Sequence, residues 1–209
     1  MKFVPWSLRR LYDVTFDQAL DELERSVADL RHAGCRRVIV CGHSLGACAS
    51  LGLAARRGGV DALVLLAPGH FPERLASAQL TTSSLALARQ ALARGDELRI
   101  PLTDCNQGIS RVLRIRPAAY LSYFEPQGPA QWSTNARATA TPLPILVVIG
   151  RRDPARAPGI DYAFALTSHH SSSKYVEIDA GHSDTPARAT DIVLDWVAAL
   201  ELDNPDDRP

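Results

Sequence analysis

The stretch that decides the fold is VIVCGHSLGACAS, residues 38–50. An apolar run from Val38 to Cys41 leads into the pentapeptide Gly42-His43-Ser44-Leu45-Gly46, and small residues that suit a helix follow. The pattern predicts a buried strand, a tight turn with Ser44 at its apex, and a helix. Such a G-x-S-x-G turn is a nucleophile elbow, which raises the serine hydroxyl to where a base can reach it. An ordinary strand-to-helix turn with Ser44 as N-cap is the alternative interpretation.

A serine nucleophile needs a base and a group that orients the base, and the C-terminal half offers both. The apolar run 144–150 is typical of a buried parallel strand, and Asp153 follows it closely. A second strand is expected over 174–178, and His182 lies on the loop after it. All three residues therefore fall at the carboxyl ends of strands, the edge at which open α/β sheets place their sites.

Other residues could compete for these roles. Asp104 is the runner-up acid, although its surroundings, residues 103–108, favour a turn. His43 is expected to pack or hydrogen-bond locally, and His70 could contact a substrate. His169 and His170 lie in a polar stretch that indicates a solvated loop. No pair of histidines has a metal-ligand spacing with a matching carboxylate or cysteine, so no metal site is expected.

The motifs GHSLG (residues 42–46), GRRDP (150–154) and AGHSD (180–184) together resemble those of the α/β-hydrolase family, over roughly residues 34 to 200. The resemblance implies a mostly parallel sheet with helices on both faces and serine-hydrolase chemistry without a cofactor. It implies Ser44 as nucleophile, Asp153 as acid, His182 as base, and the Leu45 amide as one donor of the oxyanion hole. The expected partner is a small-molecule carboxylic ester or a related acyl compound.

The chain is predicted to form one domain over residues 1–209, with a small cap insertion at 69–141 and a disordered tail at 203–209. The clearest helix spans Thr15 to Gly34, and Thr15 with Gln18 makes a capping box. Further helices are expected at 84–94 and 188–200. The cap carries aromatic residues that either line an acyl pocket or only pack the cap onto the core: Tyr120, Tyr123, Phe124 and Trp132.

The resemblance also implies a chain shortened at its N-terminus. Only 43 residues precede Ser44, and they hold no His-Gly loop of the kind that supplies a second oxyanion amide. Lys2 to Val4 is a possible strand remnant. In the family's fold a further strand lies beside the elbow strand. Without that further strand, the elbow strand would present an unpaired edge prone to self-association. The alternative function is accordingly a weak or inactive α/β-hydrolase-like protein that lacks a complete oxyanion hole.

Composition excludes some classes of protein. Hydrophobic residues make up 46%, charged residues 22%, and the formal net charge is zero, which argues against a nucleic-acid or anionic-membrane binder. The four cysteines form no C-x-x-C motif, and a reduced, cytoplasmic protein is expected, with Cys41 and Cys48 buried. Only Lys2 and Lys174 among the basic residues are lysines, a bias that suggests a bacterial gene.

Overall fold

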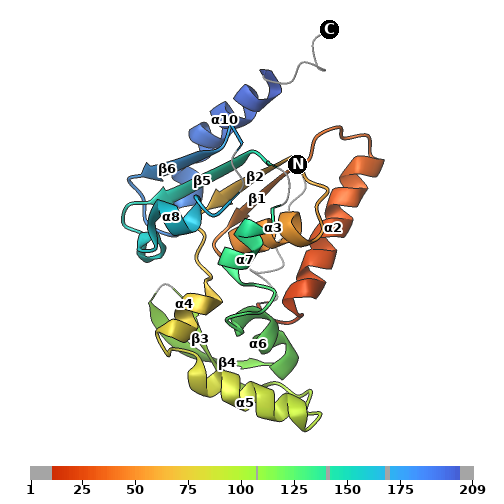
Figure 1. The fold of residues 1–209 in the computed structure, drawn as a ribbon, viewed down its shortest axis with the longest axis vertical. Coiled ribbons are helices and arrows are strands. Elements are labelled where there is room, and N and C mark those ends of the chain that lie inside the picture. The colour runs from red at the N-terminus through yellow and green to blue at the C-terminus, as the bar shows by residue number, and fades with distance from the viewer. Residues whose placement is uncertain (1–10, 107, 140–141, 168–169, 203–209) are drawn as a thin grey trace.

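The computed structural model describes residues 11–106, 108–139, 142–167 and 170–202. Its centre is a four-stranded parallel sheet with strand order β1-β2-β5-β6 (Figure 1). The strands are β1 (Ile39–His43), β2 (Ala62–Leu66), β5 (Ile145–Gly150) and β6 (Lys174–Ile178). Strands β1, β5 and β6 lie where the sequence predicted strands, and the buried strands β2 and β5 are continuous apolar runs.

Helices cover both faces of this sheet. On one face Leu63, Leu65 and Val147 pack against helix α3 (Leu45–Arg56), and α2 (Phe16–His32) lies beside α3. On the other face Val64 and Val148 pack against α10 (Thr190–Leu202), which follows the short helix α9 (Thr185–Arg188). Successive strand residues thus point to opposite helical layers, as the pleat requires. The expected final helix is split into α9 and α10.

The start of α2 agrees with the sequence. The Thr15 hydroxyl accepts from the backbone of Gln18, and the Gln18 side chain accepts from the backbone of Thr15. This reciprocal capping box satisfies two amides that the first turn leaves without helical partners. Beyond the other end, Gly34 takes a left-handed φ of 88°, which a glycine adopts without steric cost.

The segment 69–141 lies between β2 and β5 and extends away from α10 (Figure 1). We call it the insertion. Its helices are α4 (Pro72–Ser77), α5 (Thr82–Ala93), α6 (Pro117–Phe124) and α7 (Trp132–Arg137). It also holds an antiparallel hairpin of β3 (Ile100–Asn106) and β4 (Ile109–Ile115), which the sequence analysis did not predict. Asp104 was expected in a turn; this was wrong, because it lies in β3 opposite Arg111, and the turn comes later.

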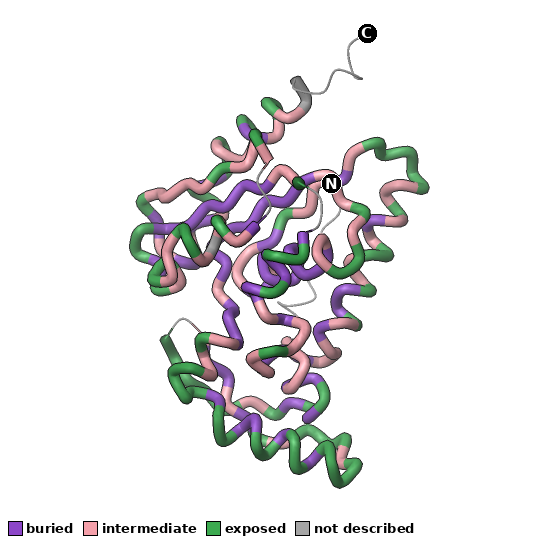
Figure 2. The backbone as a smooth tube through the Cα atoms, in the orientation of Figure 1, coloured by how far each residue is buried: buried purple, intermediate pink, exposed green. Residues whose placement is uncertain are grey.

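The aromatic residues of the insertion are buried. Tyr123 and Phe124 contact the ring of Tyr12 edge-on, and Tyr123 also contacts Phe16, which joins α6 to α2. Trp132 packs on Phe71 at a centroid distance of 5.5 Å. Figure 2 shows the buried residues running from the central strands into the base of the insertion. Of the two interpretations left open, the structure supports packing.

Strand β1 differs from its neighbours. In the described part of the chain it pairs with β2 alone, whereas β2 and β5 each have a strand on both sides. Every residue of β2 and β5 is buried, but Ile39 and Val40 are half-buried and Cys41 is exposed. The predicted burial of Cys41 was therefore wrong, because no strand of the described residues covers the other side of β1; Cys48, on α3, is buried as predicted. The expected strand remnant at 2–4 and the tail at 203–209 lie outside the described residues.

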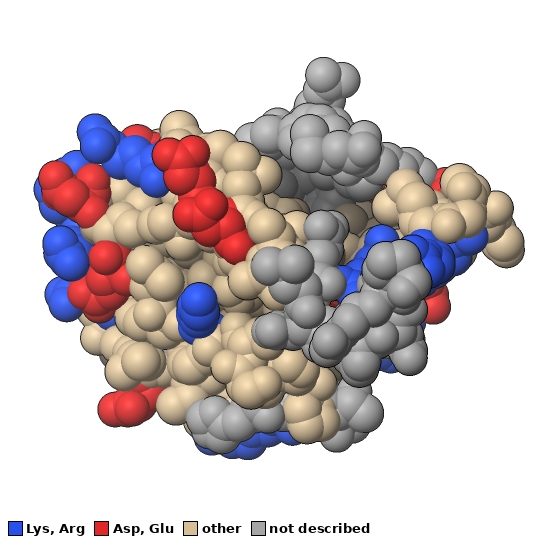
Figure 3. Space-filling model, turned by 90° about the horizontal axis from the view of Figure 1, so that it is seen from above, with Lys and Arg blue, Asp and Glu red and all other residues tan. Residues whose placement is uncertain are grey.

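The surface carries both signs of charge. On the face seen in Figure 3, acidic and basic side chains lie beside one another. Among the helices of the described residues, none is long and apolar enough to cross a membrane.

Candidate active site

The elbow between β1 and α3 holds Ser44 in an unusual backbone conformation. Its φ is 57° and its ψ is −119°, a region that non-glycine residues occupy at an energetic cost. The turn is also too tight for a side chain at Gly42, since a Cβ there would lie 2.2 Å from the Gly46 carbonyl oxygen. The glycine therefore lets strand and helix approach, and the strained turn presents the serine hydroxyl at the strand end.

Three predicted residues meet at this point in one chain of hydrogen bonds. The Ser44 Oγ lies 2.8 Å from His182 Nε2, and His182 Nδ1 lies 2.8 Å from Asp153 Oδ2. Asp153 is 4% exposed and His182 is 5% exposed, so solvent barely reaches either. A carboxylate only accepts, so Nδ1 carries the proton and Nε2 is free to accept from the serine. This is the arrangement in which an imidazole acts as a general base.

Neighbouring groups hold the acid and the base in place. The second carboxylate oxygen of Asp153 accepts from the Ala155 amide at 2.8 Å, at the start of a 3₁₀ turn. His43 donates from Nε2 to the carbonyl oxygen of His182 at 2.9 Å. Burial lowers the pKa of His43 and so favours the neutral ring, in which the proton on Nε2 makes this bond. The expectation that His43 acts locally agrees with this contact.

Leu45, the expected oxyanion donor, is the first residue of α3. The amides of a first helical turn have no acceptor within the helix, and they carry the positive end of its dipole. Leu45 also borders the cavity into which Ser44 opens. This position agrees with the expected role of its N–H as an oxyanion donor beside Ser44.

That cavity has a volume of about 200 Å³. The sheet side contributes Ser44, Leu45 and His182, and the segment before α2 contributes Leu11 and Tyr12. The end of β3, at Cys105 and Asn106, borders it from the insertion. The remaining lining residues are His43, Gly69, His70, Cys105, Asn106 and Ser183.

A buried network that the sequence did not reveal fixes the hairpin beside this cavity. The Tyr12 hydroxyl donates to Asp104 Oδ1 at 3.0 Å, and Arg111 Nε donates to Asp104 Oδ2 at 2.8 Å. Asp104 is 1% exposed. Burial, and then the charge of Asp104, raise the pKa of Tyr12 well above its ordinary value, so the phenol stays protonated as a donor. Asp104, the runner-up acid, thus has no hydrogen bond to His182 among the described contacts and instead joins β3 to the segment before α2.

The remaining histidines are engaged or undescribed. His70 is buried and donates from Nε2 to the Tyr123 carbonyl oxygen at 2.7 Å, so it borders the cavity while its Nε2 is already bonded. Burial lowers its pKa, which favours the neutral ring. His170 accepts through Nδ1 from the Ser172 amide, and His169 lies outside the described residues. Within the described ranges, no group of three or more His, Cys, Asp or Glu is arranged to hold a metal ion.

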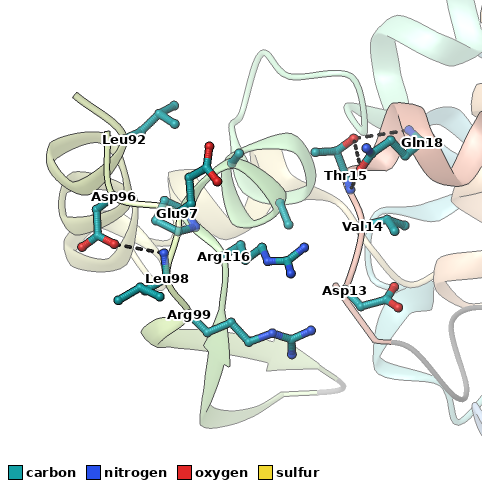
Figure 4. A pocket seen from close by; sticks show the side chains of 13 residues that line it. Asp13, Val14, Thr15, Gln18, Leu92, Asp96, Glu97, Leu98, Arg99 and Arg116 are labelled. Atoms are coloured by element: carbon teal, nitrogen blue, oxygen red, sulfur yellow. Dashed lines mark hydrogen bonds between the residues drawn. The ribbon is translucent and has the colours of Figure 1, made fainter. Parts of the chain in front are cut away.

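A second, larger cavity of about 700 Å³ lies elsewhere, between the start of α2 and the insertion (Figure 4). Arg99 and Arg116 extend from the insertion toward the segment that carries Asp13, and Glu97 lies nearby. None of Ser44, Asp153 and His182 borders it. Because its lining mixes both charges and holds no nucleophile–base pair, we place the candidate active site in the smaller cavity.

Comparison with known proteins bears on the fold of the chain. Residues 6–195 match the model of the alpha/beta hydrolase family. The structure is similar to monoacylglycerol lipase of Paleococcus ferrophilus, with a TM-score of 0.61 and 17% identity over 88% of this chain and 76% of that chain. It is also similar to the alpha/beta hydrolase GrgF from Penicillium sp. sh18, with a TM-score of 0.59 and 15% identity over 89% of this chain and 71% of that chain.

A third similar structure is the esterase domain of a protein from Rhodothermus marinus, with a TM-score of 0.53 and 19% identity over 90% of this chain and 70% of that chain. At these identities the likeness concerns the fold. A comparison with curated proteins finds no significant match.

Proposed function

The chain belongs to the α/β-hydrolase family, and from that premise we propose that it is a serine hydrolase acting on a small carboxylic ester or a related acyl bond. The observation that carries the proposal is the unbroken hydrogen-bond chain from Ser44 through His182 to Asp153, with both bonds at 2.8 Å. A serine without such a base is a weak nucleophile, whereas one hydrogen-bonded to an oriented imidazole is activated.

In the acylation step, Ser44 Oγ attacks the carbonyl carbon of the ester while its proton passes to His182 Nε2. The carbonyl oxygen becomes an oxyanion and accepts from the Leu45 N–H. Asp153 keeps the imidazole in the correct tautomer and stabilises its positive charge. When the intermediate collapses, the bond to the alcohol breaks and His182 returns the proton to the leaving alkoxide.

In the deacylation step, water takes the place of the alcohol. His182 accepts a proton from the water, whose oxygen attacks the acyl carbon; the bond to Ser44 Oγ then breaks as His182 returns the proton to that oxygen. The products are a carboxylic acid and the regenerated serine. The balance needs water alone, so the proposed reaction uses no cofactor.

The cavity supports a small substrate. Its volume of about 200 Å³ lies below the roughly 300–1,000 Å³ typical of sites for drug-sized ligands. The large aromatic side chains of the insertion pack in the core, and none of Tyr120, Tyr123, Phe124 and Trp132 is among the described residues that line this cavity. We therefore expect short acyl chains to be preferred.

A fluorophosphonate probe tests the proposal. We expect it to label the wild-type protein covalently, because the activated hydroxyl of Ser44 attacks phosphorus as it would a carbonyl. The Ser44→Ala variant should lose labelling and ester hydrolysis while keeping its far-UV circular dichroism. Ser50→Ala is the matched control, since the Ser50 hydroxyl donates to the Gly46 carbonyl oxygen and does not border the cavity. Labelling that persists without Ser44 would overturn the assignment.

One observation favours a second candidate, a weak or inactive hydrolase-like protein. Leu45 is the one oxyanion donor that the elbow itself supplies, and loss of one donor typically costs about 10²–10³ in kcat. The rate of p-nitrophenyl acetate hydrolysis separates the two. A Ser44-dependent rate barely above the buffer background would favour the second candidate.

A further inference from the structure

We propose that Asn106, at the tip of the β3–β4 hairpin, donates a hydrogen bond from its carboxamide to the carbonyl oxygen of the substrate and so serves as the second oxyanion donor. The inference rests on the proposed function. It gives the insertion a direct part in the chemistry. The sequence motifs, by contrast, placed every reacting group on the loops of the sheet.

The first support is where Asn106 lies. It borders the same cavity of about 200 Å³ as Ser44, Leu45 and His182. In so small a space, a substrate carbonyl within reach of Ser44 Oγ is also near the other walls. A carboxamide has two N–H donors, and among the described contacts the Asn106 side chain has no hydrogen-bond partner. A lining residue whose carboxamide has no partner among the described contacts can offer its donors to a ligand.

The second support is that other polar side chains around the cavity are already committed. His43 donates to the His182 carbonyl oxygen, His70 donates to the Tyr123 carbonyl oxygen, and Tyr12 donates to Asp104. Ser183 also lines the cavity and has a hydroxyl, but it lies on the exposed loop directly after His182. Asn106 therefore presents the donors on the insertion side of the cavity.

The third support is that the backbone next to Asn106 is held firmly. Asp104, two residues before it, accepts from both Tyr12 and Arg111. The Thr103 carbonyl oxygen accepts from the Tyr120 hydroxyl at 2.8 Å, and the Cys105 sulfur lies 3.2 Å from Ser110 Oγ. An oxyanion donor stabilises charge best when it is fixed before the reaction, because little reorganisation is then needed. The network around Asp104 supplies this fixation.

Three variants test the proposal with p-nitrophenyl acetate. Asn106→Leu keeps the shape of the side chain without its donors, and Asn106→Ala removes it. Ser183→Ala is the matched control on another wall. We expect both Asn106 variants to lose about 10²–10³ in kcat with KM nearly unchanged, since the bond strengthens as the oxyanion forms. Ser183→Ala should stay within a few-fold of the wild type.

A second measurement separates donation to the oxyanion from mere packing. A trifluoromethyl ketone forms a tetrahedral adduct with the serine, and its inhibition constant should rise in the Asn106 variants by about the factor lost in kcat/KM. The melting temperature should not change. If the wild type is active and the Asn106→Leu variant has the same kcat, or differs only in KM, the inference is overturned and the proposed function stands. A wild type without Ser44-dependent activity would overturn the inference together with the proposed function.

Discussion

The parallel sheet and the insertion contribute to one cavity by different means. The sheet places Ser44, Asp153 and His182 on three loops after neighbouring or nearby strands, each within a short motif. The insertion contributes through a hairpin that is fixed by contacts far apart in sequence, such as that between Tyr12 and Asp104, 92 residues apart. A motif is enough to locate a reacting group, whereas the shape of the space around it depends on long-range packing.

This contrast predicts that substitutions in the two regions will separate activity from stability. We expect the residues on the sheet loops to take part in the reaction, and we expect the stability of the fold to depend little on most of their hydrogen bonds. The hairpin residues hold two segments together. The following experiments, in order of expected effect, either sharpen or break that division.

The largest effect is expected at the acid and the base. Asp153→Asn should lower kcat by about 10⁴, because the amide favours the wrong imidazole tautomer, and His182→Ala should do similar damage. The double variant should be little worse than either single one, because the three groups act as a unit. Steady-state kinetics with a short p-nitrophenyl ester and circular dichroism check this. Losses that multiply would argue against a shared unit.

Asp104→Asn is the control for the acid, since Asp104 is the other buried carboxylate near the cavity. It should leave the pH profile of kcat unchanged, because Asp104 bonds to Tyr12 and Arg111 rather than to His182. A large loss with Asp104→Asn and none with Asp153→Asn would show that the sequence motif named the wrong acid.

A smaller effect, and of the opposite kind, is expected in the insertion. Tyr12→Phe removes the donor to Asp104 Oδ1 and leaves a buried carboxylate oxygen without that bond. It should lower the free energy of unfolding by about 1–3 kcal/mol, with a modest fall in kcat as the hairpin loosens. Urea unfolding with the same ester assay measures both. Tyr175→Phe is the matched control, because that hydroxyl makes only a long bond to Glu177 at 3.4 Å; an equal loss there would show that the Asp104 network contributes nothing special.

The smallest effect concerns two strands, β1 and β4, each of which pairs with only one strand of the described residues. Strand β1 carries no Lys, Arg, Asp or Glu, whereas β4 carries Arg111 and Arg114, and charges on an edge discourage pairing with another chain. We propose that β1 mediates self-association of the protein at high concentration. Cys41→Lys should shift the protein toward the monomer in size-exclusion chromatography over a range of concentrations, and Val112→Lys on β4 should not. The reverse result would assign association to the insertion.

The sheet was largely predictable, and the reason is local. Strands buried on both faces give apolar runs, and the loops after them carried GHSLG, GRRDP and AGHSD. The hairpin was missed because Pro101 and the exposed side chains of β4 obscure the alternation of a strand. Neither the place of Asn106 at the cavity nor the Tyr12–Asp104 hydrogen bond could be predicted, because nothing in the residues around Tyr12 or Asp104 indicates that the two side chains meet. Cys41 was misjudged because exposure depends on which strand lies beside β1.

Gly69 limits how this site can be altered by mutation or by design. A Cβ at that position would lie 2.8 Å from His182 Cε1 and 3.3 Å from Ser44 Oγ, so even alanine would force the imidazole to shift. The hairpin side of the cavity is constrained in other ways, because the Cys105 sulfur lies 3.2 Å from Ser110 Oγ and Asn106 is the proposed oxyanion donor. An engineer who wishes to change the substrate range should therefore leave Gly69 and Asn106 untouched and vary another lining residue, such as Leu11.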